Sequence, residues 1–444
     1  MKTLRDIPQI DKFLSSHEFG GICNALLTKI AQEVIQELRD DLLCKNRESF
    51  DEFELICEVK KRYLASFESS LIPIINATGV ILHTNMGRSL IAKELFLNVA
   101  KVVCNYSNLE YNLEKGCRGE RYEHVSEHLK TLLGVEDVLV VNNNASAVFL
   151  ILNTFAANKE VVVSRGELVE IGGSFRIPEV MRQSGAILKE VGATNKTKKI
   201  DYQNAIGENT AMLMKVHQSN FSIEGFSEAT PYADIKKLSE EHGLIDYCDW
   251  GSGYIPTLPY NLGNKEPSLL TFLQDRPSLL SFSGDKLFGS VQAGIIVGKK
   301  ELINKLKKNQ LLRMLRVDKI TLALLEETIK AYLQERYEQI PTLWLLMQDV
   351  ASLHKRALHV RVQIGKNLCE VVESRTFMGG GTLPNRDFPT VALHVRGKAV
   401  VLEKKFRENH LIGRIENDKF LIDFRSILPE LEPQIIQIAK GILG

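Results

Sequence analysis

From Ile72 onward, short apolar runs with strand character alternate with amphipathic helical segments, and this alternation restricts the fold more than any other feature. Parallel strands need long crossover connections, usually helices, so an alternating order predicts a mostly parallel sheet with helices on both faces. We therefore predict an α/β fold. The expected strands are VEDVLVV at 135–141, KEVVVS at 159–164, AILKEV at 186–191, TAMLMKV at 210–216 and LIDYCD at 244–249.

The two ends of the chain have a different pattern. Residues 1–70 carry apolar side chains at helical spacing, including Ile30, Val34 and Leu38, and a second helix is expected from Phe50 to Phe67. The chain is also helical in pattern from Lys299 to about Tyr337, and strand-like runs such as VALHV and FLIDF follow. We expect a helical domain at 1–70, a large α/β domain at 71–335 and a small α/β domain at 336–444.

Composition excludes several classes of protein. The net charge is +1, so no general basic field marks a nucleic-acid-binding protein, and any such contact must be local. The seven cysteines include no CxxC pair, which favours reduced thiols in the cytosol. The first residues, MKTLRDIPQIDKF, lack the apolar core of a signal peptide, and no apolar run approaches the length of a membrane span. We expect a cytoplasmic protein.

The stretch Leu280–Gly298, LSFSGDKLFGSVQAGIIVG, predicts a strand, a tight loop that carries Lys286, and a second strand. Burial between strands lowers the pKa of a lysine and makes a neutral amine available for Schiff-base chemistry. Ser283 is close enough to help hold an anionic group beside this amine. The combination points to a pyridoxal phosphate lysine. Ser-x-x-Lys alone is short and common, and by itself favours a solvent-exposed lysine at a strand end.

A turn rich in asparagine follows the first predicted strand, in VVNNNASAVF at 140–149. The N-terminus of a helix presents free N–H groups and the positive end of its dipole, which suits a phosphate group. The expected anion contacts are Asn144, Ala145 and Ser146. An ordinary turn capped by asparagine is an equally good interpretation of this segment alone.

An acidic residue ends another predicted strand, in LIDYCDWGSG at 244–253. The carboxyl ends of parallel strands face the cleft where α/β proteins bind ligands. Pyridoxal phosphate needs a carboxylate there to keep its ring nitrogen protonated. Asp249 is better placed than Asp246 because it adjoins the Gly-Ser-Gly break, although a capping aspartate is the simpler alternative.

Three arginines are candidates for binding a tetrahedral oxyanion. Arg88 lies in HTNMGR, and Arg313 and Arg316 lie three residues apart in LLRMLRVDK, so we expect the last two to share one helical face. The segment from Lys299 to Lys319 has eight basic residues against two acidic ones. A solvated basic helix is the simpler interpretation of its lysines.

Two further pairs are weaker candidates. Arg118 and Arg121, in GCRGER, are an anion candidate of the same kind. His124 and His128 have the spacing of two metal ligands on a helix, but they lack the glutamate of an HExxH site. We interpret this histidine pair as structural and predict no metal site.

Several of these segments together resemble one family, the bacterial selenocysteine synthases, or L-seryl-tRNA(Sec) selenium transferases. The likeness is carried by INATGVILHTNMGRSL, VVNNNASAV, LMKVHQSN, DWGSG, LRMLRVDKITLALLE and, most specifically, SRGELVEIGGSFRIPEVMRQ. It covers about residues 70–330, and both ends of the chain also look similar. After the lysine loop this sequence has Ser290 and Val291 where the family more often has Gly-Gly-Pro-Gln, a departure that a loop can tolerate.

The resemblance implies a fold-type-I pyridoxal phosphate enzyme. In such an enzyme Lys286 would bind the cofactor covalently, Asp249 would pair with its ring nitrogen, and Asp285 would lie beside the reacting centre. The implied reaction is loss of the seryl hydroxyl to give a dehydroalanyl-tRNA, followed by addition of selenium from selenophosphate. By the same resemblance, the residues that hold this donor would be Arg88, Arg313 and Arg316.

The resemblance also implies partners. The helical domain at 1–70 would dock tRNA(Sec), although its ten basic and thirteen acidic residues argue against a purely electrostatic grip. The family forms a ring-shaped homo-oligomer built from dimers, with active sites at the dimer interface.

Two other functions remain open at this point. An ammonia-lyase of phosphorylated amino sugars, with the same fold, would explain Lys286 and the arginines equally well, but it would not need the N-terminal helices. A non-catalytic RNA-binding or scaffolding protein on a degenerate enzyme fold would not need the lysine, aspartate and arginine set.

Overall fold

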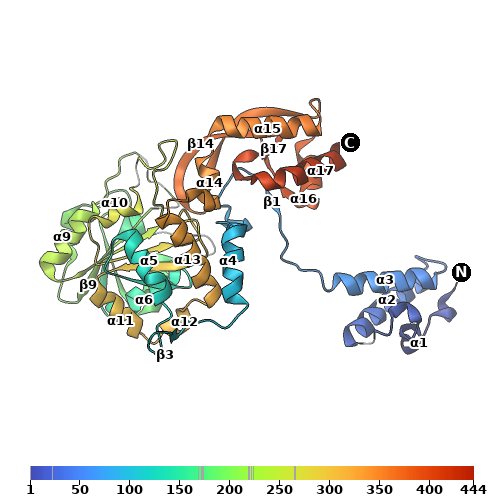
Figure 1. Cartoon of the computed structure of the whole chain (residues 1–444), viewed down its shortest axis with the longest axis horizontal. Coiled ribbons are helices and arrows are strands. Elements are labelled where there is room, and N and C mark those ends of the chain that lie inside the picture. The colour runs from blue at the N-terminus through green and yellow to red at the C-terminus, as the bar shows by residue number, and fades with distance from the viewer. Residues whose placement is uncertain are drawn as a thin grey trace. The chain divides into compact units, whose positions relative to one another are not determined.

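The computed structural model describes residues 2–22, 24–168, 170–171, 175–218, 221, 223, 225–264 and 267–444. The chain divides into two compact units, Met1–Pro73 and Ile74–Gly444 (Figure 1). The conspicuous block SRGELVEIGGSFRIPEVMRQ and the segment LMKVHQSN each lie partly outside the described residues, at 169, 172–174 and 219–220.

The first unit is helical, as the spacing of its apolar residues predicts. It contains α1 (Ile10–Leu14), α2 (Ala25–Leu43) and α3 (Glu52–Ala65). Asn24 caps α2 by accepting a hydrogen bond from the Leu27 N–H at 2.9 Å, and Asp51 caps α3 in the same way. Ile30, Val34 and Val59 are among the residues that form its own buried core.

The second unit is built on a seven-stranded sheet, which confirms the predicted α/β fold (Figure 1). Only β12 runs antiparallel to its neighbours. In spatial order the strands are β4 (Asp137–Val141), β12 (Gly294–Gly298), β11 (Leu279–Ser283), β10 (Ile245–Gly251), β9 (Thr210–Val216), β5 (Glu160–Ser164) and β8 (Ile187–Val191).

Helices cover both faces of this sheet, as continuous apolar strands require. Alternate residues of β4 point to opposite faces: Val138 and Val140 join one buried cluster, and Leu139 and Val141 join the other. One face carries α5 (Glu123–Leu133), α10 (Leu269–Leu273) and α13 (Lys319–Leu333). The other carries α6 (Asn144–Ala156), α7 (Ile177–Ser184) and α11 (Lys300–Lys308). The helices α8 (Lys199–Ala205) and α9 (Tyr232–His242) pack against buried residues of β5 and β9, among them Val162 and Leu213.

A four-stranded antiparallel sheet forms the C-terminal part of the same unit. Its strands are β13 (Cys369–Gly379), β14 (Thr382–Val395), β17 (Lys419–Asp423) and β16 (Arg414–Glu416). Against it pack α15 (Val350–Ile364), α16 (Ala399–Glu408) and α17 (Glu432–Leu443). The division of this unit at residue 335 stays a prediction.

The segment INATGVILHTNMGRSL forms less strand than its composition suggests. The strand of the segment is β1 (Ile75–Asn76), and it pairs in parallel with β15 (Leu411–Ile412), more than three hundred residues later. Ile75 and Ala77 are buried in the core of the C-terminal sheet. This pairing ties the start of the second unit to its C-terminal part.

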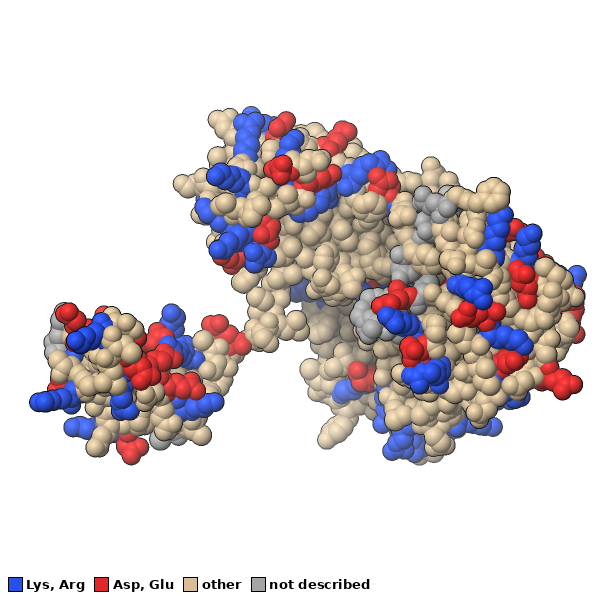
Figure 2. Space-filling model, turned by 180° about the vertical axis from the view of Figure 1, so that it is seen from behind, with Lys and Arg blue, Asp and Glu red and all other residues tan. Residues whose placement is uncertain are grey.

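In the described part of the chain, no helix is both long enough and apolar enough to cross a membrane. Acidic and basic side chains are interspersed over the face seen in Figure 2.

Candidate active site

The lysine loop joins β11 to β12, which confirms the predicted strand–loop–strand arrangement. The two strands pair antiparallel, with Ser283 opposite Gly294. Lys286 and Asp285 are 7% and 8% exposed, so the lysine lies in the interior, as its setting predicts. The Gly289 N–H donates to the Lys286 carbonyl at 2.9 Å and closes the turn. Gly289 has φ +75°, and a Cβ there would lie 2.4 Å from Ile340 Cγ2, so this turn requires glycine.

Asp249 lies beside this loop on β10, and the structure gives it a partner far away in sequence. The Asn144 side-chain amide donates a hydrogen bond to Asp249 Oδ1 at 2.7 Å. Burial raises the pKa of Asp249, while the Asn144 bond and the positive charge of Lys286 act in the opposite direction. Asp249, Asn144 and Lys286 therefore form one group.

The N-terminus of α6 is arranged differently from the expected anion cradle. Asn143 caps the helix by accepting a hydrogen bond from the Ser146 N–H at 2.8 Å, and the side-chain amide of Asn144 is used on Asp249. A Cβ on Gly294 would lie 2.2 Å from the Asn143 carbonyl oxygen, so β12 and this turn are in close contact. Anion binding by Asn144, Ala145 and Ser146, and by Ser283, stays a prediction.

His217 lies beside Asp249 and is not among the site residues predicted from the sequence. It follows β9, and its backbone N–H donates to the Asp249 carbonyl at 2.8 Å. Its ring stacks on Trp250 with 4.4 Å between the ring centroids. Burial, followed by the charge of Lys215, lowers its pKa to about 4, so the imidazole is neutral at pH 7. The charges of Lys286 and Arg386 contribute to the same shift. The signal that the sequence offered for His217 was its position directly after a predicted parallel strand.

Arg88 lies beside the lysine loop. Its Nη1 donates to Asp285 Oδ2 at 2.8 Å, and Arg88 is one third exposed as a side chain. The backbone at Arg88 has φ +61°, an uncommon conformation for a residue other than glycine. This ion pair places the Arg88 guanidinium beside Asp285, the residue that precedes Lys286.

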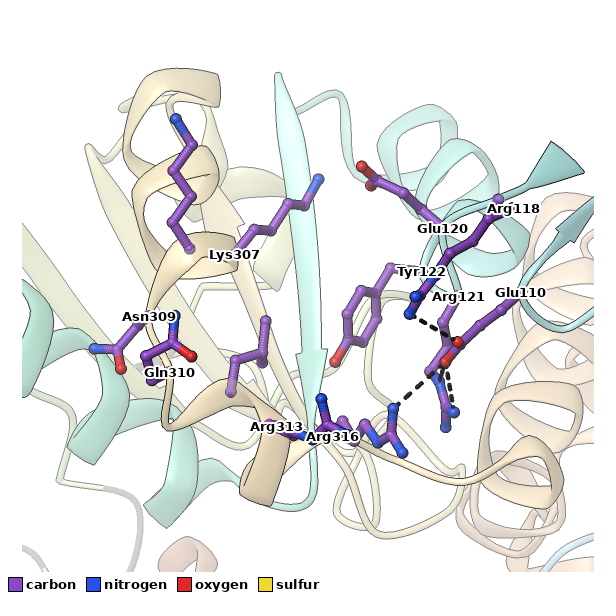
Figure 3. A pocket seen from close by; sticks show the side chains of 13 residues that line it. Glu110, Arg118, Glu120, Arg121, Tyr122, Lys307, Asn309, Gln310, Arg313 and Arg316 are labelled. Atoms are coloured by element: carbon purple, nitrogen blue, oxygen red, sulfur yellow. Dashed lines mark hydrogen bonds and ion pairs between the residues drawn. The ribbon is translucent and has the colours of Figure 1, made fainter.

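Arg313 and Arg316 lie in a different pocket, of about 370 Å³ (Figure 3). The prediction that they share a helical face is wrong, because α12 (Leu312–Leu315) is one turn long and the backbone becomes extended at Arg316, with ψ 143°. Both side chains still line the pocket, but Arg88 is absent from its described lining residues. The chain by itself therefore does not gather the three arginines in this pocket.

The weaker arginine candidates belong to the same pocket, together with Lys307 and Lys308. Glu110 lies among them, as Figure 3 shows: its carboxylate accepts hydrogen bonds from Arg121 at 2.8 Å, from Arg118 at 3.3 Å and from Arg316 at 3.4 Å. The Arg121 hydrogen bond is the largest cause of the lowered pKa of Glu110. The pocket is strongly basic, with Glu110 as an internal counter-charge.

The residues around Lys286 fit pyridoxal phosphate. Asp249 is a buried carboxylate that accepts a hydrogen bond from the Asn144 side-chain amide, and a protonated ring nitrogen would compensate the burial of its charge. Asn144 Oδ1 is itself buried and has no hydrogen-bond partner among the described residues. A buried lysine, this carboxylate and the N-terminus of α6 meet at the carboxyl edge of a mostly parallel sheet. Fold and site define a fold-type-I pyridoxal phosphate enzyme.

Comparison with known proteins gives the family. Residues 74–428 match the model of SelA, L-seryl-tRNA selenium transferase. The chain is 56% identical over 446 residues to an L-seryl-tRNA(Sec) selenium transferase of Aliarcobacter butzleri, covering 100% of this chain and 99% of the relative. A relative of the same name from Campylobacter jejuni is 47% identical over 427 residues, 96% of each chain. The chain therefore belongs to the SelA family of L-seryl-tRNA selenium transferases.

A solved structure supports the fold. The structure of a D-glucosaminate-6-phosphate ammonia-lyase matches with a TM-score of 0.60 at 18% identity, and the match covers 86% of this chain and 97% of the lyase. At this identity the likeness concerns the fold alone. The ammonia-lyase alternative therefore has no support from the family comparison.

Proposed function

We propose that this chain converts L-seryl-tRNA(Sec) to L-selenocysteinyl-tRNA(Sec), with pyridoxal phosphate on Lys286 and selenophosphate as the selenium donor. The observation that carries the proposal is the buried group of Lys286, Asp249 and Asn144 in a chain of the SelA family. When bound, pyridoxal phosphate supplies an electron sink for removing the seryl hydroxyl and adding selenium.

The side chains have separate roles in this proposal. Lys286 holds the cofactor and can carry a proton to and from the seryl Cα. Asp249 keeps the ring nitrogen protonated, and Asn144 orients that carboxylate. Asp285, paired with Arg88 at 2.8 Å, adds a carboxylate next to the lysine.

The test uses the purified full chain. A cofactor absorption near about 420 nm, followed by selenium-dependent formation of selenocysteinyl-tRNA(Sec), supports the proposal. A coloured protein that releases ammonia from a phosphorylated amino sugar and leaves seryl-tRNA(Sec) unchanged contradicts it. A colourless protein that binds RNA favours the scaffold alternative.

The first unit is the proposed docking site for tRNA(Sec). It has its own core, so it can be present or absent without rebuilding the sheet. The first 70 residues contain ten basic and thirteen acidic residues, which gives a net charge of −3. This charge favours recognition of RNA shape over general electrostatic binding to the phosphates.

Removal of residues 1–73 is expected to leave a folded, coloured protein that binds tRNA(Sec) at least about tenfold more weakly. The physical reason is that the cofactor site and its supporting core lie in Ile74–Gly444. Filter binding or a gel shift with tRNA(Sec) measures the loss, and the visible spectrum is the control. Unchanged affinity of the shortened chain would assign the first unit another role.

A ring-shaped homo-oligomer built from dimers is also part of the proposal. Arg313 and Arg316 line a pocket that does not include Arg88, so a second copy is the means by which all three arginines reach one anion. The helix α4 (Lys93–Val103) supplies apolar surface for such a contact, with Phe96 and Leu97 more than half exposed.

Arg313→Ala is expected to raise the KM for the selenium donor by roughly ten- to a hundredfold, because a charge-assisted hydrogen bond to a dianion contributes about 1.5–3 kcal/mol. Arg313→Lys should restore little, since a point charge cannot replace a guanidinium fork. Steady-state kinetics with varied donor gives the KM, and affinity for seryl-tRNA(Sec) should stay unchanged. A loss of tRNA affinity with an unchanged donor KM would assign the arginine to the RNA backbone.

Mixed oligomers test the sharing of sites directly. Arg313→Ala and Lys286→Ala chains, each inactive or impaired alone, are expected to regain activity when co-expressed, because one site in the mixed dimer then receives both intact residues. If co-expression restores nothing, each site draws Lys286 and Arg313 from the same chain.

The cytoplasm is the proposed location. Cys44, Cys57, Cys104 and Cys117 are exposed and not joined in disulfides, as expected in a reducing compartment.

A further inference from the structure

The hairpin of β13 and β14 reaches from the C-terminal sheet to the lysine loop. The Leu82 N–H donates to the Met378 carbonyl near its tip at 2.9 Å. Leu383 and Phe388, both on β14, are buried in the same apolar cluster as Leu287, the residue after Lys286. This contact places the start of β14 beside the candidate active site.

Arg386 lies between these two buried residues and faces the same side as Phe388, because side chains alternate along a strand. Its Nη1 donates to the Leu262 carbonyl, and Leu262 belongs to the same apolar cluster. The next residue, Asp387, faces outward and is paired with Arg375 in an exposed ion pair. The hairpin therefore presents one arginine inward and another outward.

The backbone beside Arg386 is held in an unusual conformation. Leu383 has φ +49° and Asn385 has φ +55°, although neither is glycine. Such conformations are costly and persist where the surrounding structure fixes them, often at ligand-binding positions. Here the buried cluster and the contact with Leu82 fix the hairpin tip.

The charge of Arg386 acts on the same group as the charge of Lys286. Both contribute to lowering the pKa of the buried His217 imidazole. The positive charges of Arg386 on β14 and of Lys286 in the lysine loop therefore both act at His217. The backbone N–H of His217 donates to the Asp249 carbonyl, so this region adjoins Asp249. A partly buried region of this kind favours an electron-rich ligand atom such as a carbonyl oxygen.

We propose that Arg386 positions the substrate by donating a hydrogen bond to the carbonyl oxygen of the seryl ester. This inference rests on the proposed function. The seryl amino group must approach Lys286, and the ester carbonyl is attached directly to the seryl Cα. A donor on the hairpin that packs against Leu287 is therefore suited to meet this oxygen. The apolar surroundings of Arg386, with Leu262, Leu383 and Phe388, suit a neutral acyl group better than a phosphate.

The test compares seryl-tRNA(Sec) with deacylated tRNA(Sec) on the holoenzyme without a selenium donor. Arg386→Gln is expected to weaken seryl-tRNA(Sec) binding by roughly tenfold and to leave deacylated tRNA(Sec) within about twofold. The donor KM should not change. Arg386→Lys should recover part of the difference, because it keeps one donor and loses the fork.

Arg375→Gln is the matched control, since it removes the outward arginine of the same hairpin. It should leave both affinities unchanged. Equal losses for acylated and deacylated tRNA, or no loss for either, overturn the assignment, and the first result places Arg386 on the RNA backbone. Thermal melting and the cofactor spectrum of each variant identify misfolding, in which case Arg386→Lys carries the comparison. Failure of the unmodified chain to bind seryl-tRNA(Sec) would instead contradict the proposed function.

Discussion

Lys286→Ala is expected to lower turnover by at least about a thousandfold and to remove the visible absorption of the bound cofactor. The reason is that the amine is both the attachment point and the proton carrier of the proposed site. The fold should survive, because the turn is closed by backbone hydrogen bonds such as Gly289 N–H to the Lys286 carbonyl, which alanine retains. Absorption spectra, seryl-tRNA(Sec) turnover and thermal melting measure the three consequences.

Two observations sharpen this experiment. Borohydride reduction of the unmodified protein followed by peptide mapping should place the pyridoxyl group on Lys286, and a map to any other lysine would sink the assignment. Lys300→Ala is the control, because Lys300 is exposed at the start of α11 and should leave colour and activity intact.

Asp249→Asn is expected to reduce activity by roughly three orders of magnitude while stabilising the cofactor-free protein. Asparagine cannot hold the ring nitrogen in its protonated form, so the electron sink is lost. In the protein without cofactor, the carboxylate is buried against one amide donor, and removing its charge should raise the free energy of unfolding by about 1–3 kcal/mol.

The pH dependence of this stabilisation has a definite sign. Burial raises the pKa of Asp249 in the folded protein, so the folded state favours the protonated carboxyl group. The ionised Asp249 carboxylate therefore lowers the stability of the folded protein. This loss begins as the pH rises above the pKa of the unfolded state, about 3.9, and is complete above the raised pKa of the folded state. The stability difference between Asp249→Asn and the unmodified apoprotein should therefore narrow as the pH falls toward about 4.

Asp246→Asn is the matched control on the same strand. Asp246 is also buried, but it accepts hydrogen bonds from the Ser278 N–H at 2.8 Å, from the Ser278 hydroxyl at 2.6 Å and from the Tyr232 hydroxyl. Its replacement should destabilise the protein and leave the cofactor spectrum unchanged. If Asp249→Asn also destabilises the apoprotein, the Asp249 carboxylate is compensated by the protein itself, and the stability argument fails.

The contrast between these two aspartates shows where sequence reasoning stops. Asp249 was preferred because it adjoins Gly-Ser-Gly, which is a local signal. The Asp246 carboxylate accepts hydrogen bonds from Ser278 and Tyr232, while the Asp249 carboxylate accepts one from the Asn144 amide, and this difference depends on contacts across the sheet. Asn144 itself was expected to bind an anion, because the helix start was visible in the sequence and its partner on β10 was not.

The arginines give a second example. Their spacing predicted a shared helical face, yet α12 ends before Arg316. The two arginines line one pocket although only Arg313 lies on the helix. The role of Arg88 as an anion-binding candidate stays a prediction, and its pairing with Asp285 could not be read from a separation of almost two hundred residues.

The sequence by itself determined the α/β class, the order of the strands along the chain, the helical N-terminal unit and the lysine loop. These follow from local periodicity and turn chemistry, which act over a few residues. Only the tertiary structure decided that β1 pairs with β15, that Asn144 donates to Asp249, that His217 stacks on Trp250, and that Leu383 and Phe388 of the β13–β14 hairpin pack with Leu287 of the lysine loop. Each of these depends on which distant surfaces pack together, and such packing is set by the whole core, beyond the reach of any local pattern.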